Sequence, residues 1–189
     1  MTTDIHRRLR EATQAAHARL EARAGILEQI ASPGGRRAIV MRFHWLHADI
    51  EAAAAPWLVD LPALAFETRR RTRLLEQDMA ALDIGEFRPT PGGVQAGGAA
   101  EALGLMYVLE GSTLGGRLIE SRVRSAGGNL QGLSFLNPYG RHTSLRWRAF
   151  LAVAEDLASD PAAAVAMVRG AVAGFDHAER CLCAEPVHA

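Results

Sequence analysis

Helical periodicity recurs along almost the whole of this chain, while signals for β-strands are nearly absent. The apolar stripe of the first segment, 4–24, consists of Ile5, Leu9, Ala12, Ala16 and Leu20. Further helices are expected at 36–55, 65–82, 99–125, 143–158 and 161–184. The pattern therefore predicts an all-α protein of about six main helices, with residues 1–189 forming one domain.

Proline and glycine mark the breaks between these expected helices. The Ser-Pro-Gly-Gly sequence at 32–35 separates the first two helices, and Pro56 is expected to end the second. A loop rich in proline and glycine is expected at 88–98, and an ordered loop at 126–142. The last helix is expected to start with Asp160 as its cap and Pro161 in its first turn.

Charge and composition narrow the range of partners. The 189 residues include 21 acidic and 21 basic side chains, all of the latter arginine, so nothing points to nucleic acid or an anionic membrane. No apolar run approaches the ~20 residues that span a bilayer, and no secretory signal is visible. Cys181 and Cys183 do not suggest a disulfide framework. A cytoplasmic protein without a membrane partner is expected.

A glycine-rich sequence, Gly-Ser-Thr-Leu-Gly-Gly at 111–116, falls inside the expected helix 99–125. Each glycine in a helix interior costs about 1 kcal/mol relative to alanine. Gly111 and Gly115 share one face, where the missing Cβ atoms leave peptide groups exposed. A large planar ligand on that face and close packing of another helix both explain the pattern, and the glycines alone do not distinguish them.

Histidine and arginine supply the candidate ligands. His17 lies on the flank of the first apolar stripe, and Arg10 is on the same side of that helix about 10 Å away. Such a pair suits a cofactor with a metal centre and peripheral carboxylates. His44, His47 and Glu51 also share a helix face and could bind zinc or iron, although packing is the favoured explanation. The arginines at 69, 70, 71 and 73 are expected to form a solvated helix face.

Two segments resemble parts of the heme oxygenase family. Residues 9–17, Leu-Arg-Glu-Ala-Thr-Gln-Ala-Ala-His, resemble the proximal helix of that family, which ends in the iron ligand. Residues 107–116, Tyr-Val-Leu-Glu-Gly-Ser-Thr-Leu-Gly-Gly, look like the distal helix of its bacterial branch. The spacing of the two segments and the order of the expected helices agree with this resemblance.

The resemblance implies that heme b lies between these two helices, as cofactor and substrate at once. Cleavage by O2 at a meso carbon would yield biliverdin, ferrous iron and carbon monoxide. His17 would be the metal ligand, and the catalytic distal wall would comprise Gly111, Ser112, Gly115 and Gly116. Arg10 matches the propionate-contacting position of the family, and Arg146 and Arg148 fall near another such region.

The resemblance also implies external partners. No flavin or iron–sulfur motif is present in the sequence, so electrons would come from a separate reductase or ferredoxin, and the product could pass to a bilin-accepting protein. Ser112 stands where animal members carry aspartate, which leaves a non-catalytic heme carrier or sensor as the alternative. A non-heme metal at His44, His47 and Glu51 is a further alternative.

Overall fold

The computed structural model describes residues 4–85 and 93–183, and these residues form helices without any β-strand. The α-helices are α1 (Asp4–Ala24), α2 (Ile26–Ala31), α3 (Pro33–Leu58), α4 (Thr72–Ala81), α5 (Ala99–Ser125), α6 (Thr143–Leu157) and α7 (Pro161–Leu182). Short 3₁₀ turns occur at η1 (Pro62–Leu64), η2 (Phe66–Arg69), η3 (Ser134–Leu136) and η4 (Gly140–His142). The predicted all-α class is confirmed.

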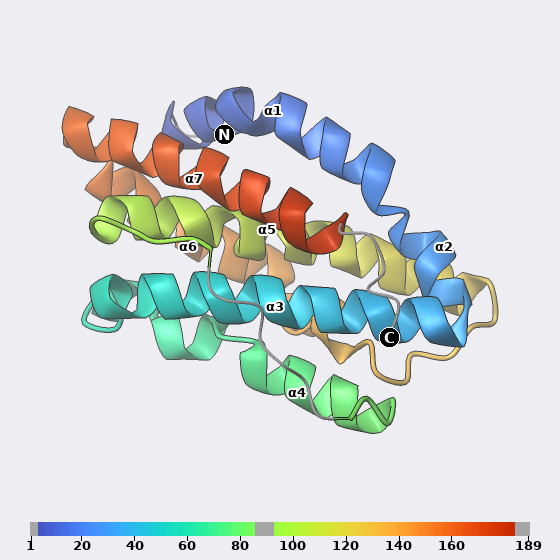
Figure 1. The fold of residues 1–189 in the computed structure, drawn as a ribbon. Helices are drawn as coiled ribbons and strands as arrows, with labels where there is room; N and C mark the ends of the chain where they lie inside the picture. The colour runs from blue at the N-terminus through green and yellow to red at the C-terminus, as the bar shows by residue number, and fades with distance from the viewer. Residues whose placement is uncertain (1–3, 86–92, 184–189) are drawn as a thin grey trace.

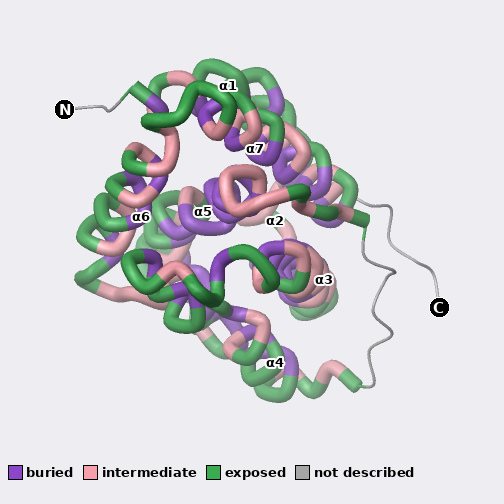
Figure 2. The backbone as a smooth tube through the Cα atoms, turned by 90° about the vertical axis from the view of Figure 1, so that its left-hand side faces the viewer, coloured by how far each residue is buried: buried purple, intermediate pink, exposed green. Residues whose placement is uncertain are grey.

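Helix α5 lies in the middle of the molecule, with the other long helices around it (Figures 1 and 2). It packs most extensively on α7, which also supports α1 on its other side. Helix α3 packs against both α5 and α7, and α4 covers the outer side of α3. Helices α1, α5 and α7 all run from left to right in Figure 1.

Three glycines bring α5 and α7 into backbone contact. A Cβ atom added to Gly104 of α5 would overlap the carbonyl oxygen of Met167, and one added to Gly170 of α7 would overlap the carbonyl oxygen of Glu101. At Gly174 an added Cβ would come within 2.8 Å of the Val108 side chain. Small residues thus allow α5 to pass unusually close to α7. The sequence analysis assigned no role to these three glycines.

The largest difference from the predicted helices occurs near residue 33. The Ser-Pro-Gly-Gly sequence begins a helix and does not separate two distant ones: Ser32 caps α3 by accepting a hydrogen bond from the Gly35 amide at 3.1 Å, and Pro33 occupies the first turn. The short helix α2 precedes it and was not predicted. At the other end, α3 continues past Pro56 to Leu58.

The remaining boundaries follow the predictions more closely. Helices α1 and α5 begin and end where the sequence predicts, although Ala12 is exposed and Thr13 takes its buried place in the α1 stripe. The expected helix 65–82 is η2 followed by the shorter α4, because extended Arg70 interrupts it. The loop 126–142 is ordered, and part of the expected loop 88–98 lies outside the described residues. None of the helices in the described part of the chain has the length and apolar character needed to cross a membrane.

Candidate functional site

The outer side of α5 carries two glycines whose missing side chains are not replaced by protein atoms. A Cβ atom at Gly115 would have no neighbour within 4 Å, and one at Gly111 would meet only the Trp147 ring, at 3.9 Å. The adjacent Leu114 and Leu118 are exposed. We call Gly111, Leu114, Gly115 and Leu118 the open strip. Packing within the protein does not explain why this apolar strip lacks two side chains.

Gly116 has a different environment. It lies about 140° around the helix from Gly111, and an added Cβ would overlap the carbonyl oxygen of Leu136 in η3. Close packing against the loop therefore accounts for Gly116, which is buried and does not belong to the open strip. Ser112 is exposed, and its hydroxyl donates a 2.7 Å hydrogen bond to the Leu109 carbonyl, so its oxygen still has a lone pair with which to accept.

His17 presents its imidazole at the surface of α1. Its side chain is 56% exposed, and the ring meets Phe175 of α7 edge-on with centroids 5.6 Å apart. Nδ1 lies 3.5 Å from a carboxylate oxygen of Glu21, one turn further along α1. A carboxylate at this position favours the tautomer with the proton on Nδ1, which leaves the Nε2 lone pair free. No hydrogen bond to Nε2 is formed by the described residues.

The register of α1 and α5 places His17 near the open strip. His6 of α1 lies against Tyr107 of α5, with ring centroids 6.3 Å apart, and Arg10 is close enough for its charge to lower the pKa of His6, together with burial. From Arg10 to His17 and from Tyr107 to Gly115 each helix rises about 10–12 Å. Because α1 and α5 run in the same direction (Figure 1), His17 lies about level with Gly115.

An aromatic cluster closes one end of this region. Trp147 of α6 contacts the rings of His6 and Tyr107, at centroid distances of 5.6 and 5.5 Å, and stacks on Phe150. The same indole meets Gly111 at the start of the open strip. The sequence analysis noted Trp147 only as a neighbour of two arginines, and His6 was not considered. Their side chains define the boundary between α1, α5 and α6 (Figure 2).

The three candidate propionate-binding arginines differ in how far they are committed to other contacts. Arg10 is exposed on α1, on the side of Tyr107. Arg148 is exposed and forms no ion pair with the described residues. Arg146 is half-buried: its guanidinium donates to the Thr68 hydroxyl at 2.5 Å and lies over the Tyr139 ring at 5.0 Å. Arg146 therefore already has protein partners.

A buried ionic cluster fixes α5 immediately before the open strip. Glu110 is 1% exposed and accepts hydrogen bonds from Arg69 at 2.6 Å, Arg71 at 3.1 Å and the Tyr139 hydroxyl at 2.7 Å. The expectation of a solvated face is thus wrong for Arg69 and Arg71, which are both buried. The carboxylate compensates their desolvation, and removal of one partner from such a cluster typically costs about 3–5 kcal/mol.

The candidate ligands on α3 have structural partners. Burial lowers the pKa of His47, and the neutral ring donates from Nδ1 to Glu51 at 3.1 Å. Glu51 also accepts from the Arg71 amide at 2.7 Å and the Thr72 hydroxyl at 2.7 Å, and these hydrogen bonds hold its pKa low despite burial. His44 instead lies 3.8 Å from Glu76. In the described part of the chain His44, His47 and Glu51 do not converge on a metal position.

The buried histidines predict how stability depends on pH. Burial lowers the pKa of His47, His6 and His177 in the folded state, so the unfolded chain binds more protons below pH 6.5. Each such histidine removes up to about 1.4 kcal/mol of stability per pH unit below 6.5. The urea midpoint of the heme-free protein should therefore be lower at pH 5.5 than at pH 7.5.

Substitution of His47 tests its share of this effect. In His47→Gln the difference between the two midpoints should shrink, while the matched control His142→Gln, at an exposed histidine, should keep the wild-type difference. At pH 5.5 the carboxylates with lowered pKa values, Glu51 and Glu101, remain ionised, so they do not contribute. Equal midpoints for the wild type at both pH values would contradict the prediction.

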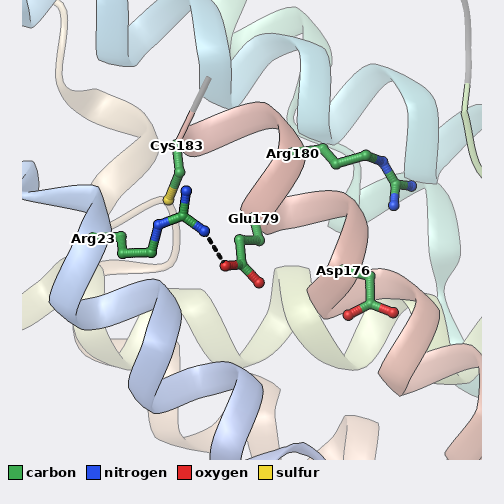
Figure 3. Close-up of a pocket in the computed structure, with 5 residues that line it drawn as sticks. All are labelled: Arg23, Asp176, Glu179, Arg180 and Cys183. Atoms are coloured by element: carbon green, nitrogen blue, oxygen red, sulfur yellow. Dashed lines mark hydrogen bonds and ion pairs between the residues drawn. The ribbon is translucent and has the colours of Figure 1, made fainter. Parts of the chain in front are cut away.

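Two surface pockets lie away from these residues. The first, of about 370 Å³, is lined by Arg23, Asp176, Glu179, Arg180 and Cys183. In Figure 3, Arg23 of α1 is paired with Glu179 of α7, and Arg180 points away from that pair. The second, of about 570 Å³, extends from Leu114 and Leu118 of the open strip toward Asn137 and Thr143. None of the eight predicted site residues lines either pocket.

Comparison with known proteins identifies the family. A protein named heme oxygenase from Xanthomonas campestris pv. campestris (strain 8004) is 33% identical over 149 residues, which cover 78% of this chain and 88% of the relative. A crystal structure of the NO- and CO-bound heme oxygenase from Neisseria meningitidis has the same fold, with a TM-score of 0.78 at 20% identity over 96% of this chain and 91% of that one. No family model matches the sequence. The chain belongs to the heme oxygenase family.

Family membership confirms the resemblance drawn from residues 9–17 and 107–116. The individual roles of the site residues stay predictions. The structure adds two residues to the candidates, Glu21 and Trp147. Glu21 was detectable because it lies four residues after His17, on the same helix face. Trp147 was not, since its contact with Gly111 depends on how α6 packs on α5.

Proposed function

We propose that this protein is an enzyme that cleaves heme with O2 and external electrons to biliverdin, ferrous iron and carbon monoxide. The observation that carries the proposal is the pairing of two helices. The open strip of α5 has bare peptide groups at Gly111 and Gly115, and the exposed His17 of α1, with Nε2 free of hydrogen bonds from the described residues, lies about level with it. An apolar planar ligand with a metal centre suits both surfaces.

The residues of these two helices would divide the work of holding heme. When bound, heme supplies the iron at which dioxygen is activated. His17 would hold that iron through Nε2, and Glu21 would keep the proton on Nδ1 and fix the ring orientation. On the opposite side, Gly111 and Gly115 would let the helix backbone approach the ring plane. Ser112 would orient water through its oxygen, without the charge that an aspartate carries.

Arginine charge would orient the ligand. Arg10 and Arg148 are exposed and can turn toward a carboxylate, which a guanidinium binds in bidentate fashion. Arg146 would have to leave Thr68 and Tyr139 to do so. We therefore assign the propionate contacts to Arg10 and Arg148, and give Arg146 the role of supporting the buried cluster around Glu110.

Electron supply forms part of the proposal. We propose a separate reductase or ferredoxin as the donor, acting in the cytoplasm, because the sequence contains no flavin or iron–sulfur motif. The direction in which biliverdin leaves, toward a bilin-accepting protein or elsewhere, follows from the partner and not from this chain.

Turnover of added heme tests the function directly. Purified protein is mixed with hemin and supplied with ascorbate or a reductase system, with catalase present to remove free peroxide. The Soret band should disappear while a broad red absorbance of biliverdin grows in a one-to-one ratio with heme. A Soret band that shifts on reduction but never bleaches would contradict catalysis and favour a heme carrier or sensor. Absence of any Soret shift would contradict heme binding altogether.

A further inference from the structure

Three potential metal ligands converge where α3 packs on α7. Nε2 of His177 lies 2.9 Å from the Asp49 carboxylate and 3.5 Å from the sulfur of Cys181. The three ligand atoms all lie within 4.8 Å of one another. His177 and Cys181 are one turn apart on α7 and both are buried, while the Asp49 side chain is 14% exposed. This cluster faces α3, whereas Phe175 of the same helix contacts His17.

The donor set is typical of zinc-type cations. Imidazole, thiolate and carboxylate are the three ligand classes that zinc uses in proteins, and tetrahedral sites with three protein ligands leave a fourth position for water. In a tetrahedral zinc site the ligand atoms are about 3.3–3.6 Å apart, given metal–ligand distances near 2.0–2.3 Å. The nitrogen–sulfur distance of 3.5 Å already meets this requirement. The nitrogen–oxygen distance of 2.9 Å needs to open by a few tenths of an ångström.

Two neighbouring contacts limit how a cation can enter. Without metal, Arg180 donates to Nδ1 of His177 at 3.3 Å, so Nε2 carries the proton and donates to Asp49. A cation on Nε2 moves that proton to Nδ1, and Arg180 must then turn away, which its exposed position allows. Burial, reinforced by the charge of Asp49, raises the pKa of the Cys181 thiol to about 11. The thiol is therefore no nucleophile at neutral pH, and metal binding releases its proton.

We propose that Asp49, His177 and Cys181 form a binding site for one zinc-type divalent cation, distinct from the proposed heme site. The Asp49 carboxylate and His177 alone are explained by an ion pair that ties α3 to α7. The buried sulfur at ligand distance from the same nitrogen is not explained by that pair. Solvent reaching the partly exposed Asp49 supplies the fourth ligand.

Cobalt titration tests this site without reference to heme. Co²⁺ is added to the full-length heme-free protein, and to the heme-loaded protein in parallel. One equivalent should bind, with a near-ultraviolet thiolate-to-cobalt band and the intense visible bands of four-coordinate cobalt, and Zn²⁺ should displace it. Asp49→Asn should weaken binding at least tenfold, and Cys181→Ser should abolish the thiolate band.

Cys183 provides the matched control, two residues further along the chain. Cys183→Ser should bind Co²⁺ as the wild type does, with the thiolate band intact. An unchanged titration in Cys181→Ser, or no thiolate band in the wild type, would overturn the proposal. If Cys181→Ser does not fold, Asp49→Asn decides: unchanged affinity in that variant would likewise overturn it. Failure of heme turnover leaves these readouts unaffected, so the two proposals fail independently.

Discussion

Replacing His17 with alanine should remove histidine ligation of heme iron and reduce heme affinity on the order of 100-fold, equivalent to about 2.7 kcal/mol. Nε2 of this ring has no hydrogen-bond partner among the described residues, so the substitution removes the ligand and disturbs only the Phe175 and Glu21 contacts. The optical and resonance Raman spectra of the ferrous heme complex measure the loss. Added imidazole should restore the five-coordinate histidine-type spectrum, because it occupies the space that the side chain leaves.

A second histidine on the same helix serves as the control. His6→Ala removes an imidazole from the aromatic cluster with Tyr107 and Trp147, and its complex should keep the histidine-ligated spectrum. Glu21→Gln should keep the ligand but lower heme affinity about tenfold or more, because the carboxylate that orients Nδ1 is lost. A wild-type spectrum in His17→Ala would disprove the assignment, and loss of the spectrum in His6→Ala alone would transfer it to His6.

Alanine substitutions at two glycines of α5 should change stability in opposite directions. In Gly104→Ala the new methyl group overlaps the Met167 carbonyl oxygen and comes within 2.7 Å of the Ala171 nitrogen, so α5 and α7 must separate. We expect a loss of about 3 kcal/mol or more, comparable to severe overpacking. Gly115→Ala adds a methyl group to open space and should stabilise the heme-free protein by about 1 kcal/mol. Urea unfolding without heme measures both.

The same position tests whether the open strip receives heme. Gly115→Phe should leave the heme-free protein folded, since no described atom lies within 4 Å of the added Cβ, but it should lower heme affinity and the yield of biliverdin per heme consumed. Gly127→Ala is no suitable control because Gly127 has a positive φ of 73°, whereas Leu118→Ala removes bulk from the strip and should preserve turnover. Normal biliverdin yield from Gly115→Phe would show that the strip does not face the substrate.

The long helices could be predicted from the sequence because their periodicity extends over many turns. Helices α1 and α5 were predicted with the observed boundaries. Helix α2 was missed, since six residues do not show a period of 3.6 clearly. Arg69 and Arg71 were assigned to the surface because charged side chains are rarely buried without a partner. Their partner, Glu110, lies 41 and 39 residues away, and nothing local indicates that contact.

The candidate site was predictable only in part, for a related reason. The spacing of residues within one helix places Gly111 and Gly115 on a common face and Arg10 on the side of His17. Which neighbour each glycine meets depends on tertiary packing: Leu136 fills the space beside Gly116, and the backbone of α7 fills that beside Gly104. Sequence spacing treats these glycines alike, and the structure separates those that serve packing from those that face open space.

The burial of α5 changes abruptly at Glu110. Every residue from 102 to 110 is buried, whereas from 111 to 122 only Thr113 and Gly116 are buried. Amide hydrogen exchange should accordingly be slow up to the buried carboxylate and faster beyond it, because opening the second half exposes little apolar surface. A ligand that covers this half would slow its exchange, and the measured affinity would then contain the cost of ordering the backbone as well as the gain from contacts.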